Sequence, residues 1–278
     1  MILSIITINY NNAAGLRKTL ASVASQTYRN IEHIIVDAAS TDGSVAVIRE
    51  YEQTLTAHHS PFTVIWTSEK DNGIYDGMNR GIRKATGDYI QILNSGDILA
   101  SDDVTERMMN ALIHNTSVEI LYGNMVHVDA QGKPISRSSM VEYSLRQYFS
   151  STMNHDCCYI RRDLFEKYGL YDESLKIVSD WKWFLKVIGL GYVKPVYVDI
   201  DVTHFDMSGI SERNLALRNQ ERRQVLEELI PPAILADYDK HAFDAEQMNR
   251  LRKHHLYWFV YFVERVLFKL EKWHILRK

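Results

Sequence analysis

The chain has 278 residues, of which 46% are hydrophobic and 24% charged, and its formal net charge is −3. This balance is typical of an ordinary globular protein and argues against a disordered chain. The charge is uneven, because residues 250–278 hold eight Lys or Arg and two Glu, whereas the other 249 residues hold 24 basic and 33 acidic residues. An acidic body argues against a broad surface for nucleic acid.

Apolar runs of strand length alternate with helix-spaced apolar residues through the first hundred residues, which favours a parallel sheet. Strands are predicted at residues 3–8, 31–36, 62–66 and 89–93, and the helices between them are marked by Leu16, Val45 and Met78. A further helix is predicted after Ser101, which suits an N-cap. Looser strand patterns follow at residues 121–128, 158–161 and 193–198, with a helix at 181–188. No Pro- or Ser-rich linker separates residues 101–211 from 1–100, so we expect both halves on one sheet.

Residues 212–278 are predicted to form a helical extension with a basic, aromatic tail. Residues 256–263 are eight consecutive apolar or aromatic residues, flanked by Arg250, Arg252, Lys253 and Arg265. This run is too short to span a bilayer. Two alternatives remain open: a helix that lies in a membrane interface, which basic residues beside an aromatic face favour, and a helix packed on the body or in a dimer.

The two cysteines, Cys157 and Cys158, are adjacent. A disulfide between neighbours would be strained, so we expect reduced core thiols of a cytosolic protein. The first residues lead directly into an apolar strand, and no secretory signal is expected.

Polar residues follow each of the first four predicted strands, at positions 7–11, 37–43, 71–79 and 94–97. Each cluster alone has an ordinary explanation, because Asn11 or Asp42 can cap a helix and residues 71–73 can form a turn. In an open α/β sheet, however, ligands bind at the carboxyl ends of the strands. Together the clusters predict a nucleotide site.

The order and spacing of these segments resemble the family 2 glycosyltransferases, which have the GT-A fold. The resemblance covers residues 2–212 and is carried by SIITINYN (4–11), VDAASTDGS (36–44), the run from DNG to NSGD (71–97), SDWKWFLKVIGLG (179–191) and HFDMSGIS (204–211). It implies a Rossmann-like, mostly parallel α/β sheet flanked by helices, with a nucleotide-sugar-binding half (1–100), an acceptor-binding half (101–211) and a C-terminal helical extension (212–278).

The resemblance also implies roles for residues on the nucleotide side. Asp37 would accept a hydrogen bond from the base, Thr7 and Asn9 would line the same pocket, and Asp71 would lie near the base and ribose. The remaining nucleotide-binding candidates are Asn11, Ser40 and Asn79.

The metal site is expected at Asp97, which matches the last carboxylate of the family's metal-binding motif and would hold Mg²⁺ or Mn²⁺ on the diphosphate. The commonest form of the family has acids at the positions of Asn94 and Gly96, so this chain brings one carboxylate where others bring two or three. His204 is a candidate further ligand, with an ordinary structural histidine as the alternative.

Asp180 is the residue expected to act as general base, and the alternative is that it only caps the helix after it. Trp181 and Trp183 are expected to desolvate Asp180 and to raise its pKa. His155 and Trp181 are expected on the acceptor side, although a histidine in a core hydrogen-bonds equally well.

The resemblance implies an inverting glycosyltransferase that moves a sugar from a nucleotide-diphosphate sugar, a UDP-sugar foremost, to a lipid-linked or saccharide acceptor in bacterial surface polysaccharide biosynthesis. We expect it at the inner face of the cytoplasmic membrane through its tail, with a homo-oligomer left open. The sequence has neither GxGxxG nor GxxxxGK(S/T), which argues against a dehydrogenase and a P-loop NTPase. The rival hypothesis is a non-catalytic nucleotide-sugar-binding or scaffold protein with a degenerate metal site.

Overall fold

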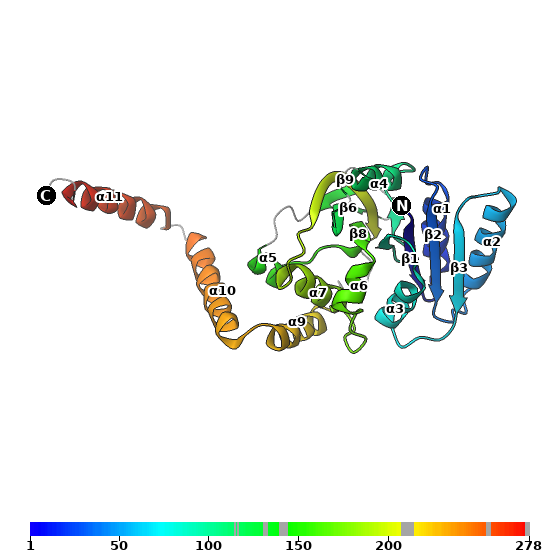
Figure 1. Cartoon of the computed structure of the whole chain (residues 1–278). Helices are drawn as coiled ribbons and strands as arrows, with labels where there is room; N and C mark the ends of the chain where they lie inside the picture. Colours follow the sequence, from blue (N-terminus) through cyan, green and yellow to red (C-terminus); the bar gives the residue numbers. More distant parts are fainter. Residues whose placement is uncertain are drawn as a thin grey trace. The chain divides into compact units, whose positions relative to one another are not determined.

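The structure is a computed structural model that describes residues 1–113, 115, 117–129, 133–138, 144–206, 214–253 and 257–275. The chain forms two compact units, Met1–Arg223 and Gln224–Lys278. The first unit holds a sheet with helices on it, and the second unit is helical (Figure 1). The boundary proposed from the sequence, after residue 211, lies within residues 207–213, which are outside the described part of the chain.

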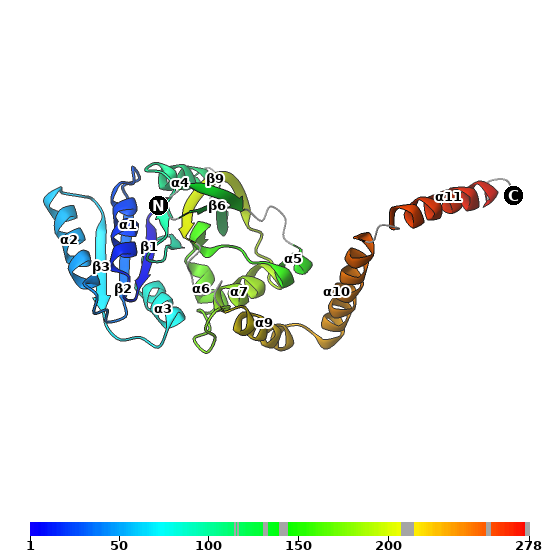
Figure 2. The ribbon, with the colours of Figure 1, turned by 180° about the vertical axis from the view of Figure 1, so that it is seen from behind.

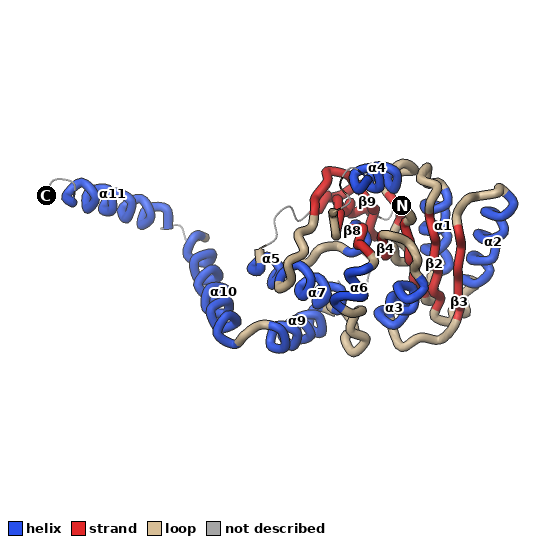
Figure 3. The backbone as a smooth tube through the Cα atoms, viewed as in Figure 1, coloured by secondary structure: helices blue, strands red, loops and turns tan. Residues whose placement is uncertain are grey.

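Strands and helices alternate strictly through the N-terminal part of the first unit, as the spacing of apolar residues predicts. The order is β1 (Leu3–Asn9), α1 (Ala13–Ala24), β2 (Ile31–Asp37), α2 (Ser44–Ala57), β3 (Thr63–Ser68), α3 (Ile74–Lys84) and β4 (Tyr89–Ile92). Figure 3 shows this alternation by colour. Each of the four strands predicted in this part agrees with an observed one to within about two residues, whereas the strand predicted at 193–198 is observed as β9, at Val196–Asp206.

The rest of the first unit is less regular. Its elements are β5 (Ile98–Leu99), α4 (Val104–Ile113), β6 (Ile120–Val128), β7 (Pro134–Ser138), α5 (Leu145–Ser150), η1 (His155–Cys157), β8 (Cys158–Arg161), α6 (Asp163–Tyr168), α7 (Ser179–Phe184), η2 (Leu185–Gly189) and β9 (Val196–Asp206). The sequence patterns did not reveal β5, β7, α5 or α6, which have two to six residues each and are too short to establish a period.

The described strands form one nine-stranded sheet with the order β3-β2-β1-β4-β8-β6-β9-β5, and β7 pairs with β6 outside this path. The first four strands are parallel to one another. Strand β8 then runs antiparallel to both β4 and β6, while β6 and β9 are parallel. The expected α/β class is confirmed, and both halves of the first unit share a single sheet.

The two faces of the parallel part are covered by different helices. Leu3 and Ile5 of β1 belong to one buried cluster with Leu16 of α1 and Val47 of α2. Alternate residues of a strand point to opposite faces, so Ile6 faces the other side, where α3 packs. Helix α3 approaches β1 so closely that a Cβ on Gly81 would lie 2.3 Å from the Ile6 side chain. Figure 2 gives the view from behind.

The second unit continues α9 (Leu215–Leu229), whose first part belongs to the first unit, and contains α10 (Pro232–Arg252) and α11 (Tyr257–Ile275). The predicted helical extension is therefore present as helices. None of the helices in the described part of the chain combines the length and the apolarity needed to cross a membrane.

Candidate active site

Asp37, at the end of β2, joins the ends of three parallel strands. It lies opposite Asn9 of β1 in the strand pairing. Its Oδ1 accepts hydrogen bonds from Asn9 Nδ2 (2.7 Å) and Ser40 Oγ (2.5 Å), and its Oδ2 accepts from Ser40 N (2.9 Å) and from Ser68 Oγ of β3 (2.6 Å). These four donors occupy the four acceptor positions of a carboxylate. In this conformation Asp37 holds the pocket expected for the nucleotide base in shape. The groups around Asp37, not its own oxygens, are then the candidates for contact with a ligand.

Two of those groups are the side chains of Asn9 and Asn11. Asn9 Oδ1 is buried and has no hydrogen-bond partner in the described part of the chain, so it is an acceptor that a ligand can use. Asn11 has a left-handed backbone (φ 48°), and its Oδ1 accepts from Thr41 N at 2.8 Å while its own N–H donates to Ser40 Oγ at 2.8 Å. The loops after β1 and β2 are thus joined side by side.

Thr7 points elsewhere. It is fully buried, and its Oγ1 lies 3.0 Å from Nε2 of His33, a residue of β2 that pairs with Ile5 and lies on the face covered by α1 and α2. A residue in this position supports the strands from within the core. We therefore leave Thr7 out of the set of ligand contacts expected from the sequence.

Asp71 stands at the entry to α3 and is half-buried. Its Oδ1 accepts a hydrogen bond from Gly73 N at 3.1 Å, and a Cβ on Gly77 would come within 3.2 Å of Oδ2. Burial raises the pKa of Asp71, and the neighbouring carboxylates of Asp76 and Asp37 add to that rise. A carboxylate desolvated in this way gains from a ligand that donates a hydrogen bond to it.

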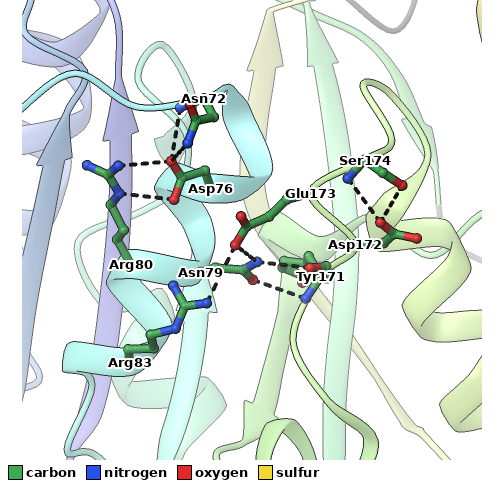
Figure 4. A network of polar contacts seen from close by, with 9 residues as sticks. All are labelled: Asn72, Asp76, Asn79, Arg80, Arg83, Tyr171, Asp172, Glu173 and Ser174. Carbon is green, nitrogen blue, oxygen red and sulfur yellow. Dashed lines mark hydrogen bonds and ion pairs between the residues drawn. The ribbon is translucent and has the colours of Figure 1, made fainter.

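Asn79 is instead a structural tie between α3 and the segment at residues 171–173. Its Nδ2 donates to Tyr171 O at 2.9 Å and to Glu173 Oε1 at 2.8 Å, and its Oδ1 accepts from Tyr171 N at 3.0 Å. Figure 4 shows this network, including the paired bonds between Arg80 and Asp76. Because Asn79 is buried and its amide is used on both sides, we leave it out of the candidate ligand contacts as well.

The loop after β4 carries the candidate metal ligand and is fixed by α1. Thr19 Oγ1 donates to Asp97 O at 2.7 Å and accepts from Gly96 N at 2.9 Å, while Asn12 Nδ2 donates to Ser95 O at 3.0 Å. Gly96 has a φ of 112°, a conformation that other residues rarely adopt. The backbone of this loop is therefore defined before any ligand binds.

Asp97 is 6% exposed, and Oδ1 of Asn94 is buried without a hydrogen-bond partner among the described residues. Both are hard oxygen donors, and Mg²⁺ sites with one or two carboxylates take further oxygens from substrate phosphates. The residues therefore fit a metal that a diphosphate completes. Within the described ranges, no group of three or more His, Cys, Asp or Glu side chains could hold a metal ion, so the diphosphate would supply the further ligands. His204 lies in β9 opposite Ile98, the residue after Asp97.

Asp180 lies in the first turn of α7, one residue inside the helix. The N-cap position belongs to Val178, whose side chain makes no capping bond, so the alternative that Asp180 serves only as a cap is not what the structure shows. Oδ2 of Asp180 lies 3.0 Å from His155 Nδ1, and Oδ1 lies 2.9 Å from the Tyr75 hydroxyl. These contacts bring η1 and α3 to one carboxylate whose side chain is 15% exposed.

The pKa of Asp180 differs from the expectation. Burial acts to raise it, but the hydrogen bond and the charge of His155 outweigh burial, and the pKa is lowered. For His155, burial acts to lower the pKa, but the carboxylates of Asp156 and Asp180 outweigh that effect and raise it to about 9. The expected rise at Asp180 was wrong because the partner histidine lies too far along the chain to be inferred from the residues next to Asp180.

The two tryptophans of α7 belong to the core. Trp181 is 1% exposed, and its Nε1 donates to Tyr148 O (2.7 Å) and Ser151 O (3.0 Å). Trp183 Nε1 donates to Gly169 O at 2.7 Å. Trp181 therefore anchors the helix that carries Asp180, and the structure gives no support for its expected place on the acceptor side.

Tyr75 is a site residue that sequence reasoning missed. It is 105 positions from Asp180, and nothing in the local pattern around it signals the contact. Its hydroxyl also lies 2.6 Å from Ile177 O, so it joins α3 to the segment that leads into α7.

Comparison with known proteins decides the family. The model of the family described as "Glycosyl transferase family 2" matches residues 4–169, which is more than half of the chain. The chain belongs to glycosyl transferase family 2. The resemblance seen in the sequence is confirmed, and the protein is a glycosyltransferase.

Relatives of this family 2 glycosyltransferase include an uncharacterized glycosyltransferase of Mycobacterium tuberculosis (strain H37Rv), 32% identical over 214 residues that cover 74% of this chain and 76% of the relative. A PGL/p-HBAD biosynthesis glycosyltransferase of Mycobacterium bovis is 26% identical over 211 residues, covering 74% of this chain and 77% of the relative.

Two solved structures share the fold of this glycosyltransferase. TarS residues 1–349 of S. aureus, in complex with UDP, gives a TM-score of 0.60 at 20% identity and covers 75% of this chain, which spans 61% of that TarS chain. The mannosyltransferase PcManGT of Pyrobaculum calidifontis, in complex with GDP-Man and Mn²⁺, gives a TM-score of 0.61 at 20% identity. The match covers 87% of this chain and 69% of the PcManGT chain. Both likenesses confirm the GT-A fold.

Proposed function

We propose that this glycosyltransferase transfers a sugar with inversion from a nucleotide-diphosphate sugar to an acceptor hydroxyl, with Asp180 as the general base. The observation that carries the proposal is the arrangement around one imidazole. His155 contacts the Asp180 carboxylate through Nδ1 and the Asn94 amide, in the loop of Asp97, through Nε2 at 3.1 Å. The side chain of His155 therefore contacts both the proposed general base and the loop proposed to hold the diphosphate.

The chemistry assigned to Asp180 is a single displacement. Asp180 takes the proton of the acceptor hydroxyl as that oxygen forms its bond to the anomeric carbon, and the bond from that carbon to the diphosphate breaks on the opposite side with its electron pair. The lowered pKa keeps Asp180 ionised at neutral pH, so it is ready to accept a proton. Asp97 and Asn94 would hold Mg²⁺ or Mn²⁺, which when bound neutralises negative charge on the departing nucleoside diphosphate.

For the donor we propose a UDP-sugar. Asn9 Oδ1 and Asp71 are the acceptors left available near Asp37, and they suit a base that presents an N–H group. TarS has been solved with UDP and with UDP-GlcNAc, and PcManGT with GDP-Man, so the donor screen below includes both UDP- and GDP-sugars. A lipid-linked or saccharide acceptor of a bacterial surface polysaccharide is proposed by analogy with the family resemblance.

We assign α11 to the cytoplasmic membrane interface, where it would hold the enzyme near such an acceptor. Large apolar side chains are exposed along it, with Trp258 at 68%, Phe259 at 67% and Phe262 at 66%. Arg265 and Lys269 continue the row of Trp258 and Phe262 toward the C-terminal end of the helix, because the spacing i, i+4, i+7, i+11 places these four residues on one face. An exposed aromatic face with basic residues beside it favours binding to anionic lipid.

The catalytic proposal is tested by incubating the full chain with labelled UDP-, GDP- and dTDP-sugars, Mn²⁺ or Mg²⁺ and a bacterial membrane extract. One donor should be consumed, and Asp180→Asn should abolish transfer while nucleotide binding persists. If a donor is bound but none is consumed, the result favours the non-catalytic nucleotide-sugar-binding protein.

The membrane proposal is tested by sedimentation with phosphatidylglycerol vesicles and, as the control, with phosphatidylcholine vesicles. The full chain should sediment with the anionic vesicles, and a chain truncated after Asn249 should not. Equal behaviour of the two chains would favour the alternative that α11 packs against protein.

A further inference from the structure

We infer that His155 is a positioning residue of the proposed base: it holds the Asp180 carboxylate and ties it to the loop of Asn94 and Asp97. The inference rests on the proposed function. It also revises the role expected for His155 from the sequence, in which the imidazole faced the acceptor.

On the Asp180 side, His155 is the stronger of two side-chain donors. An ionised carboxylate only accepts, so the 3.0 Å contact requires a hydrogen on His155 Nδ1. The second contact comes from Tyr75, whose single hydroxyl hydrogen is shared between Asp180 Oδ1 at 2.9 Å and Ile177 O at 2.6 Å. Because one hydrogen cannot be donated fully to two acceptors, Tyr75 holds Oδ1 only in part, whereas His155 can direct a whole hydrogen to Oδ2.

On its other side, the ring is held by two neighbours. Nε2 lies 3.1 Å from Asn94 Nδ2 and 3.6 Å from Asp156 Oδ1. A neutral ring with its hydrogen on Nδ1 accepts from the Asn94 amide, and a protonated ring has the carboxylate of Asp156 beside its Nε2–H. In both states Nδ1 keeps its hydrogen for Asp180, so the orientation of the base does not depend on which state is populated.

Burial limits what the imidazole can contact. The side chain of His155 is 15% exposed and both of its ring nitrogens have partners within the protein, so the ring has little surface left for recognising an acceptor. His155 also connects a loop to a helix, because Asn94 in the loop after β4 is 61 residues before it and Asp180 in α7 is 25 residues after it. An orienting group with contacts on both sides fixes the position of a catalytic side chain, and a displacement of about 1 Å can cost about 100-fold in rate.

The test compares two amides in the full chain. In His155→Asn the side-chain amide nitrogen can reach the position of Nδ1, whereas in His155→Gln it reaches the position of Nε2. We expect His155→Gln to lower kcat by about 100-fold and His155→Asn to recover about ten-fold of that loss. The Kd of UDP with Mn²⁺ should stay within about two-fold for both, measured by calorimetry, and thermal unfolding checks that both variants are folded.

A second measurement reads the contact itself. In a long-range ¹H–¹⁵N spectrum of the ring, His155 should show a protonated Nδ1, and Asp180→Asn should shift that resonance. A His155→Gln variant with the kcat of the wild type, or an unprotonated Nδ1, overturns the positioning role while the proposed function stands. A wild-type chain that consumes none of the donors overturns the proposed function and the positioning role together.

Discussion

The buried imidazole of His33 determines how the stability of this protein should change with pH. His33 lies in β2, with Nε2 3.0 Å from Thr7 Oγ1 and Nδ1 2.8 Å from the Tyr51 hydroxyl. Burial lowers its pKa from 6.5 to about 3. Unfolding exposes the ring and restores the higher pKa, so the unfolded chain binds more protons between the two values, and the free energy of unfolding falls as the pH falls.

The size of the effect follows from these two pKa values. The contribution of His33 is fully present above pH 6.5 and is lost progressively as the pH falls toward 3. The loss between pH 7 and pH 5 is about 2 kcal/mol, and each further pH unit costs about 1.4 kcal/mol. Such a loss is a large fraction of the stability of a typical protein.

Urea unfolding at pH 7, 6 and 5 measures the loss of unfolding free energy as the pH falls. His33→Gln is the variant, and Tyr51→Phe is the matched control. His33→Gln should be less stable at pH 7, because two buried hydrogen bonds change, but it should lose about 2 kcal/mol less than the wild type between pH 7 and pH 5. Tyr51→Phe keeps the titrating ring and should keep most of the steep pH dependence. The raised pKa of His155 contributes with the opposite sign, but it does so equally in all three chains. Parallel pH profiles for the wild type and His33→Gln would refute the reasoning.

Three further outcomes are expected. Tyr75→Phe removes a partly shared donor from Asp180 and should lower kcat by about ten-fold, less than His155→Gln; a larger loss than that of His155→Gln would contradict the ranking of the two donors. Gly81→Ala places a methyl group against Cγ2 of Ile6 and should destabilise the fold by about 1–3 kcal/mol in urea unfolding; because Ile6→Ala removes that Cγ2, the double variant should lose less than the sum of the two single variants. Asp97→Asn should weaken UDP binding in Mn²⁺ by at least about ten-fold in calorimetry and leave binding in EDTA unchanged; an equal loss in both conditions would assign Asp97 a structural role.

The N-terminal half of the fold could be predicted because its information is local. Each of β1 to β4 is an apolar run that differs in period from the helix after it, so strand and helix were recognised without knowledge of the partners. The meeting of the polar clusters at one edge followed from the rule that parallel strands end on the same side. The pattern at residues 158–161 predicted strand β8 itself but not its antiparallel place between β4 and β6, because its pairing joins residues far apart in the chain.

The sequence by itself therefore determined the α/β architecture, the family and the positions of Asp37 at the end of a strand, Asp97 in a loop and Asp180 at the start of a helix. Only the tertiary structure decided what each side chain meets: that Asp37 is saturated by four donors, and that Asp180 is held by His155 and Tyr75. The physical reason is the separation along the chain of the residues that each property depends on. Periodicity records which face a residue takes in its own element, whereas a hydrogen bond depends on the packing of elements from distant parts of the chain. The pKa of a buried carboxylate follows those distant partners, and so it too was decided by the packing.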